Sequence, residues 1–200
     1  MVKYEIYSTN QKLLESGVVK RDTINVARSG RYVARVYKNG TAVGSPLELN
    51  FNLHVAAGKK ISLKSNPADQ YRGNGIGSMI NGVMGSKERY GDSEWLGFAG
   101  EDCLATIDLA KKNALNSFKT TFYHAPGQWI YAPKEVILLG SDDGLKFVEI
   151  ARGTPTDDGT TLSSISLDLG GKQYQYVKVW VKSFGTIPSG AQGEGNKAWL

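Results

Sequence analysis

The sequence predicts an all-β protein, and three observations lead to that class. Short segments alternate apolar residues with polar or charged ones at a period of two, as half-buried strands do. Turn-forming sequences such as Asn39-Gly40 separate these segments at short intervals. No convincing amphipathic helix lies between them. The chain has 200 residues and one cysteine, so its stability must come from packed cores rather than from a disulfide framework.

The first predicted domain covers residues 1–52 and consists of strands. The segments Tyr4–Tyr7 and Arg31–Tyr37 alternate at period two, and Thr41–Leu47 continues beyond the hairpin turn at Lys38-Asn39-Gly40. A lone core of fewer than about 70 residues is marginally stable. We therefore expect contacts with the neighbouring domain to stabilise this one.

The second predicted domain covers residues 53–200 and is also all-β. In its last strand Val177, Val179 and Val181 share one face, which we expect to be the core side. Short strands with frequent turns favour a sandwich or a jelly roll. The expected strands are Lys60–Lys64, Leu104–Leu109, Ser117–Tyr123, Glu135–Ser141, Leu162–Leu167 and Tyr174–Ser183, with turns at Asp142-Asp143-Gly144, Asp157-Asp158-Gly159 and Gly170-Gly171.

The charge and hydropathy patterns exclude two kinds of partner. Residues 1–52 hold eight Lys and Arg against four Asp and Glu, so +4 of the net charge of +5 lies in the first domain. These cations form no dense basic stripe, and we expect no nucleic-acid partner. No apolar run approaches the roughly 18 residues of a membrane span. The sequence shows no export signal, so the protein is either cytoplasmic or cut from a longer precursor.

The residues that enzymes commonly use for catalysis are sparse. His54 and His124 are the only histidines, which excludes a zinc site built from several His and Cys ligands. No Gly-x-Ser-x-Gly nucleophile elbow occurs. The acidic pairs at residues 142–143 and 157–158 have the sequence of solvated turns. Cys103 is expected to be a small buried hydrophobe. We therefore expect no catalytic residues.

Candidate binding residues lie in the loops, where aromatic side chains stand beside charged and amide ones. An aromatic face can cover the apolar C–H patch of a sugar ring, while polar side chains pair with its hydroxyl groups. Trp129, with Tyr90 or Trp95, is the expected stacking platform, although both tryptophans could instead anchor loops. The polar partners would be Arg89, Glu94, His124 and Gln128, with His124 alternatively an ordinary loop residue.

Several motifs taken together resemble a known family. Ile107-Asp108-Leu109, Ser141-Asp142-Asp143-Gly144 and Tyr176-Val177-Lys178-Val179 resemble the coagulation factor 5/8 type C (discoidin) domain, which includes the family 32 carbohydrate-binding modules. Residues 85–98 and 126–130 resemble the version at the C-terminus of bacterial family 20 β-N-acetylhexosaminidases. Residues 19–47 resemble part of the small Ig-like chitobiase C-terminal domain that precedes it there.

This resemblance implies a fold and a function. The fold would be a small Ig-like or fibronectin-like β-sandwich in residues 1–52, followed by an eight-stranded galactose-binding-like β jelly roll. The function would be that of a non-catalytic carbohydrate-binding region of a secreted, periplasmic or cell-surface bacterial glycosidase, because the catalytic Asp-Glu pair lies in a barrel domain absent here. The ligand would be a glycan with terminal galactose or N-acetylhexosamine.

The resemblance also implies a structural calcium ion, although no cofactor is required. Family modules often hold this ion near an Asp-Gly in the loop that matches Ile80-Asn81-Gly82. The candidate ligands are Asn81 and Ser86, and Asn81 would offer an amide oxygen without the charge of a carboxylate.

Two other roles stay open. The jelly roll could dock on a catalytic domain and stabilise it, with Trp129, Tyr176 and Trp180 buried at that interface. Alternatively, it could be an adhesion domain that binds lipid or protein. Lys87 and Arg89 beside Trp95 would permit lipid binding, although the neighbouring carboxylates weaken attraction to an anionic surface.

Overall fold

The computed structural model describes residues 1–20, 23–157 and 159–200, and these residues form two compact units. Unit 1 comprises Met1–Ala57 with Asn81–Met84, and unit 2 comprises Gly58–Ile80 with Gly85–Leu200. The all-β prediction is confirmed, since the described helices are three short 3-10 turns: η1 (Asp69–Tyr71), η2 (Ile76–Ile80) and η3 (Pro126–Gln128). The predicted boundary between residues 52 and 53 stays a proposal.

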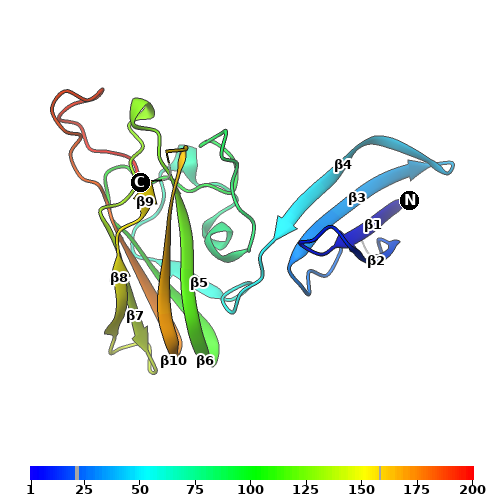
Figure 1. Cartoon of the computed structure of the whole chain (residues 1–200), viewed down its shortest axis with the longest axis horizontal. Helices are drawn as coiled ribbons and strands as arrows, with labels where there is room; N and C mark the ends of the chain where they lie inside the picture. Colours follow the sequence, from blue (N-terminus) through cyan, green and yellow to red (C-terminus); the bar gives the residue numbers. More distant parts are fainter. Residues whose placement is uncertain (21–22, 158) are drawn as a thin grey trace. The chain divides into compact units, whose positions relative to one another are not determined.

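Unit 1 contains one antiparallel sheet of four strands in the order β2-β1-β3-β4 (Figure 1). The predicted hairpin turn is confirmed, because Asn39 and Gly40 have φ of 50° and 83°, the positive values that a tight type I′ turn needs. The second sheet of the expected sandwich is not among the described residues of this unit. The strands are β1 (Val2–Tyr7), β2 (Leu13–Val18), β3 (Gly30–Lys38) and β4 (Thr41–Phe51).

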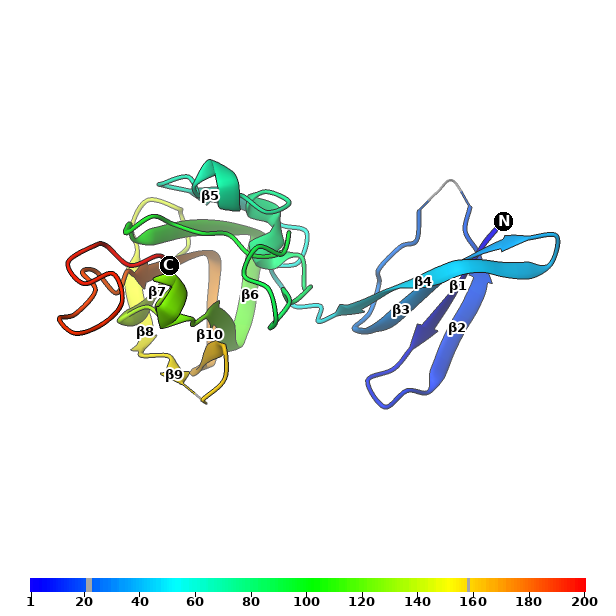
Figure 2. The ribbon, with the colours of Figure 1, turned by 90° about the horizontal axis from the view of Figure 1, so that it is seen from above.

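Unit 2 is built around two long strands that lie side by side along their length (Figure 1, Figure 2). Strands β6 (Cys103–Tyr123) and β10 (Leu162–Lys182) have 21 residues each and pair antiparallel. The order is β5-β6-β10-β7-β8, with β9 paired to β10 outside that path. The remaining strands are β5 (Lys60–Leu63), β7 (Glu135–Ser141), β8 (Val148–Gly153) and β9 (Thr156–Asp157).

The two halves of each long strand have different neighbours. The two strands pair with each other in both halves. At one end, residues 105–108 of β6 also pair with β5, and residues 176–182 of β10 also pair with β7. At the other end, residues 163–164 of β10 also pair with β9. The first half of β10 packs against β8, because a Cβ on Gly153 would lie 2.9 Å from Leu167 and 3.1 Å from Ile165. The six strands therefore form one bent sheet. Its five-stranded part is β5-β6-β10-β7-β8, and its three-stranded part is β6-β10-β9, so β6 and β10 belong to both.

Two details of the strand prediction were wrong. The four segments expected as separate strands at residues 104–109, 117–123, 162–167 and 174–183 are halves of β6 and β10. Gly170-Gly171 is not a chain reversal. Both glycines have positive φ, 60° and 74°, at a register shift between Asp168 and Lys172, so they bend β10 without ending it.

The predicted core face of β10 is confirmed. Val177, Val179 and Val181 are 8%, 7% and 4% exposed. Cys103 is 3% exposed, as expected of a small buried hydrophobe. Burial, followed by the nearby Asp102 carboxylate, raises the pKa of its thiol to about 12. This thiol is therefore protonated at neutral pH and is no nucleophile.

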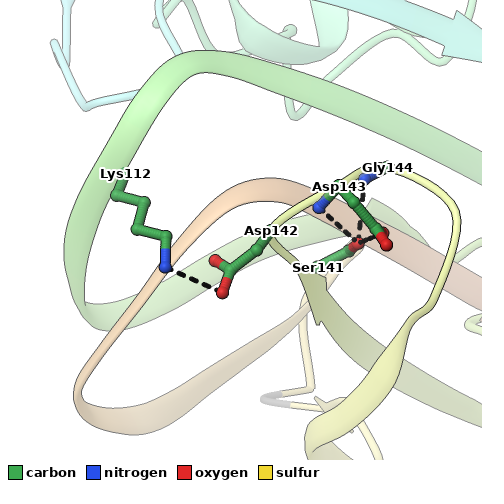
Figure 3. Close-up of polar contacts among 5 residues, drawn as sticks. All are labelled: Lys112, Ser141, Asp142, Asp143 and Gly144. Carbon is green, nitrogen blue, oxygen red and sulfur yellow. Dashed lines mark hydrogen bonds and ion pairs between the residues drawn. The ribbon is translucent and has the colours of Figure 1, made fainter.

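The Asp-Gly sequence after β7 forms the expected turn (Figure 3). Ser141 Oγ accepts hydrogen bonds from the backbone N–H groups of Asp143 and Gly144, at 3.3 and 3.0 Å. Asp143 Oδ1 accepts from the N–H groups of Lys146 and Leu145, which lower the pKa of its carboxyl. Both groups cap their own turn. The other predicted acidic turn includes residue 158, which lies outside the described residues.

Candidate functional site

The loop at residues 85–95 and the loop at residues 124–133 meet. Tyr90 Oη donates to Gln128 Oε1 at 3.4 Å, across 38 residues of sequence. Trp129 follows Gln128 directly, and Tyr90 and Trp129 each keep 36% of their surface exposed. Three of the predicted site residues are thus brought together: Tyr90, Gln128 and Trp129.

A row of five aromatic rings connects these loops to other parts of unit 2. In order they are Trp199, Tyr71, Tyr90, Tyr123 and Trp95, and we call them the aromatic row. Successive ring centroids are 5.2, 6.2, 5.9 and 5.7 Å apart, all in edge-to-face contact. Such contacts stabilise beyond the area they bury. The row therefore fixes the position of Tyr90, which is its most exposed member.

Three members of the row were not predicted as site residues. Tyr71 lies in η1, Tyr123 ends β6, and Trp199 lies near the end of the chain. Sequence offered only one signal for them, an aromatic residue beside a loop. Their convergence depends on contacts between segments far apart in the chain.

Trp95 is held within the loop. Its Nε1 donates to Ser86 O at 2.8 Å. A Cβ on Gly85 would lie 2.5 Å from the indole, so the ring packs directly on the backbone there. The sequence left Trp95 as either a stacking platform or a loop anchor. These contacts are those of a loop anchor, which also supports the aromatic row.

Trp129 has an unusual backbone conformation. Its φ of 63° and ψ of 17° place it in the left-handed region, which bulky residues seldom adopt. Its N–H donates to Pro126 O at 2.9 Å, and its carbonyl accepts from Trp199 N at 2.8 Å. Gly193 packs against the indole, where a Cβ would lie 2.4 Å from Nε1. The surroundings therefore determine where this ring lies.

The C-terminal segment, residues 184–200, supports the Trp129 loop from within unit 2. Tyr131, Ile187 and Ala198 form a small buried cluster at 7%, 1% and 0% exposure. The ring of Phe184 stacks on that of Tyr131 at 4.6 Å. Tyr131 N donates to Trp199 O at 3.0 Å. The loop at residues 124–133 thus rests on a small core of its own.

His124 is oriented by its hydrogen bonds. Its Nδ1 accepts from Ala132 N at 3.1 Å, so the proton of the neutral ring is on Nε2. That Nε2 lies 3.5 Å from Asp157 Oδ2, whose side chain is 53% exposed. His124 therefore offers a fixed N–H donor at the base of the loop that carries Gln128.

Arg89 and Glu94 differ in how firmly they are held. Glu94 Oε1 accepts from Asn74 Nδ2 at 2.9 Å, which ties it to another loop. Arg89 is exposed and takes part in no ion pair within residues 1–20, 23–157 and 159–200. Its guanidinium is free to meet a ligand beside Tyr90.

The two candidate calcium ligands already have other hydrogen bonds. Asn81 Oδ1 accepts from Val83 N at 2.8 Å, and Ser86 Oγ donates to Glu88 Oε2 at 2.9 Å. Calcium takes about six to eight oxygen ligands. Nowhere in the described part of the chain do three or more His, Cys, Asp or Glu side chains gather as a metal site would need. Asn81 and Ser86 would supply at most two of these oxygen ligands, so a calcium ion here would need further oxygens from the backbone or from water.

Comparison with known proteins finds likeness in solved structures alone. No protein-family model matches the chain, and no curated protein does. A fucose-binding module of Streptococcus pneumoniae is 16% identical with a TM-score of 0.47, covering 74% of this chain and 89% of that one. The lectin domain of lectinolysin, solved with Lewis B antigen, is 18% identical with a TM-score of 0.47, covering 73% and 89%.

A third similar structure comes from Clostridium perfringens. It is a family 32 carbohydrate-binding module in complex with GalNAc-β-1,3-galactose, 18% identical with a TM-score of 0.42, covering 70% of this chain and 88% of that one. The sequence identities and TM-scores of these three structures are low, so the ligands that they bind are not assigned to this chain. Among the described residues no helix is long and apolar enough to cross a membrane.

Proposed function

We propose that unit 2 binds the terminal sugar of a glycan and is a non-catalytic carbohydrate-binding module. The observation that carries this proposal is that the exposed Tyr90 donates a hydrogen bond to the amide of Gln128, and that the next residue, Trp129, presents a second exposed aromatic ring. Aromatic faces cover the C–H patches of a sugar, and an amide both donates to and accepts from hydroxyl groups. The aromatic row and the strained Trp129 loop support it because they preorganise the rings.

Each predicted residue takes a role that fits its contacts. Trp129 and Tyr90 are the stacking platforms, and Trp95 is a positioning residue that acts through Tyr123. Gln128 and Arg89 pair with hydroxyl or acetamido groups. His124 and Glu94 contribute at the margin of the site, because each is already partly bonded within the protein.

The finer part of the proposal rests on the resemblance of the sequence. The sugar is a terminal galactose, N-acetylgalactosamine or N-acetylglucosamine, and the parent protein is an exported bacterial glycosidase, most simply a β-N-acetylhexosaminidase. Residues 1–52 act as an Ig-like spacer and residues 53–200 as the binding module. The module performs no hydrolysis and requires no cofactor.

Calorimetric titration with these three sugars and with glucose tests the proposal. A shallow site that buries few ligand atoms should give a Kd on the order of mM to tens of µM. Trp129→Ala and Gln128→Ala should each weaken binding by about tenfold or more. The matched control is Tyr176→Ala, an aromatic residue of β10 outside the site. Absence of binding at mM sugar, or unchanged affinity in Trp129→Ala, would refute it.

The two roles left open by the sequence predict different results. A module that docks on a catalytic domain would bury Trp129, Tyr176 and Trp180 at that interface. Instead, Trp180 Nε1 donates to Asp102 Oδ2 at 2.9 Å, and Lys182 Nζ lies 3.2 Å from the centroid of its ring. These contacts occupy the indole within unit 2. A lipid-binding domain would sediment with anionic vesicles in a manner sensitive to Arg89→Gln, whereas a glycan-binding module would not.

A further inference from the structure

The charged face of the unit 1 sheet contains a hollow of about 370 Å³. It lies over β2, β1 and β3, and its floor is Val33, which is 2% exposed. Lys3 and Arg35 form one cross-strand row of its lining, and Ser16, Glu5 and Val33 form the next row along the strands. The volume lies within the ordinary range of small-molecule sites, about 300–1,000 Å³.

Two cations stand directly opposite each other in this hollow. In the pairing of β1 with β3, Lys3 is the cross-strand partner of Arg35. Like charges in this position destabilise a sheet. Lys3 Nζ lies 4.7 Å from the centroid of the Tyr37 ring, a contact that does not neutralise its charge. The only carboxylate among the residues that line the hollow is Glu5, two residues from Lys3 on the same face, so the lining keeps a net positive charge that favours an anion.

The other arginines of unit 1 that the structure describes have acidic partners. Arg31 pairs with Glu48 at 2.9 Å and Arg28 with Glu15 at 3.4 Å. Arg35 has no such carboxylate within residues 1–20, 23–157 and 159–200. Five guanidinium N–H donors therefore remain available over a half-buried position.

Glu5 decides which kind of anion fits. Its Oε2 accepts from Tyr7 Oη at 2.9 Å, and the other carboxylate oxygen remains an acceptor on the wall of the hollow. This carboxylate repels any anion, whether phosphate or the carboxylate of a sugar, so it favours a ligand that also donates hydrogen bonds to it. A ligand that also carries hydroxyl groups can donate to Glu5 and pair with the exposed hydroxyl of Ser16.

We propose that this hollow binds an acidic saccharide, with its carboxylate between Lys3 and Arg35 and its hydroxyl groups on Glu5 and Ser16. The apolar side of the sugar ring then lies over Val33. This site belongs to unit 1 and shares no residue with the site proposed above. The first unit is thus a second sugar-binding element rather than only a spacer.

Calorimetric titration of the full chain with sodium glucuronate tests this proposal, with glucose, sodium acetate and inorganic phosphate as comparison ligands. Glucuronate should bind at least about tenfold more tightly than glucose or acetate, because only it engages both rows of the lining. Arg35→Gln and Lys3→Gln should each weaken it by about tenfold. Arg28→Gln, which removes an arginine already paired with Glu15, should change it less than about twofold.

Three results would overturn the assignment. Unchanged glucuronate affinity in both Arg35→Gln and Lys3→Gln would exclude the hollow, provided that thermal melts show both variants folded. Phosphate binding as tightly as glucuronate, and more tightly in Glu5→Gln, would show a plain anion site. Loss of glucuronate binding in Trp129→Ala would place this ligand in unit 2 instead. Failure of the neutral sugars to bind affects only the function proposed for unit 2.

Discussion

Trp129 combines a left-handed backbone conformation with the proposed role of stacking on the sugar. A side chain in the left-handed region costs about 1–2 kcal/mol relative to the right-handed one. The contacts of Trp129 with Pro126, Trp199 and Gly193 hold it there. Strain that persists at an exposed aromatic residue is typical of a binding site. The sequence did not indicate this positive φ, because residues that adopt positive φ are usually glycines and position 129 is a tryptophan.

Two substitutions at Trp129 separate its backbone from its ring. Trp129→Ala and Trp129→Gly both remove the indole, so both should lose sugar binding. Glycine adopts positive φ without penalty, and Trp129→Gly should therefore be more stable than Trp129→Ala by about 1 kcal/mol. Urea unfolding of the two variants measures this difference. Equal stability would show that the left-handed conformation is not costly, and retained sugar binding in either variant would remove Trp129 from the site.

At the scale of elements, strands and turns that depend on local sequence were predicted correctly more often than features that depend on pairing between distant segments. Glu135–Ser141 was predicted with the bounds that β7 has, because its apolar run is bounded by turn residues on both sides. The Asn39-Gly40 hairpin was predicted by turn chemistry alone. Strand β2 was missed because Leu13 and Leu14 interrupt the alternation, and both are exposed at an edge strand. Strand β8 was missed because only its Ile150 is buried.

The long strands show why the remainder could not be predicted. Gly170-Gly171 has the sequence of a turn, and only its pairing with β6 on both sides makes it a bend within β10. Ala110, with φ of 68°, bends β6 at a position that no sequence rule marks. In both cases the tertiary pairing outweighs the local preference.

The loop at residues 85–95 provides a prediction at this scale. Gly85 lies under the indole of Trp95, and an added Cβ would lie 2.5 Å from it. Gly85→Ala should therefore displace Trp95, destabilise the chain by about 1–3 kcal/mol, and weaken sugar binding through the aromatic row. Gly91→Ala is the matched control, because a Cβ there meets nothing within 4 Å. Thermal melts and calorimetric titration measure both effects. Equal behaviour of the two variants would contradict the anchoring role of Gly85.

At the scale of the whole molecule, the structure shows where the excess positive charge of residues 1–52 lies, which the composition could not show. The excess of cations in residues 1–52 was too sparse to indicate a nucleic-acid partner. The register of β1 and β3 places two of these cations opposite each other over a hollow. Register depends on pairing between segments about 30 residues apart, which the sequence pattern does not specify. The aromatic row depends on similar long-range contacts.

The two proposed sites lie in separate units and share no residue, so their ligands should bind independently. Effects of substitutions that share no partners are generally additive, within about 0.3–0.5 kcal/mol. Arg35→Gln should therefore leave N-acetylhexosamine affinity unchanged within about twofold, and Trp129→Ala should do the same for glucuronate. The double variant should bind each ligand as weakly as the corresponding single variant does. Calorimetric titration of the two single variants and the double variant with both ligands completes this cycle. A coupling above about threefold would mean that one ligand meets residues of both units, and the assignment of one site to each unit would then be wrong.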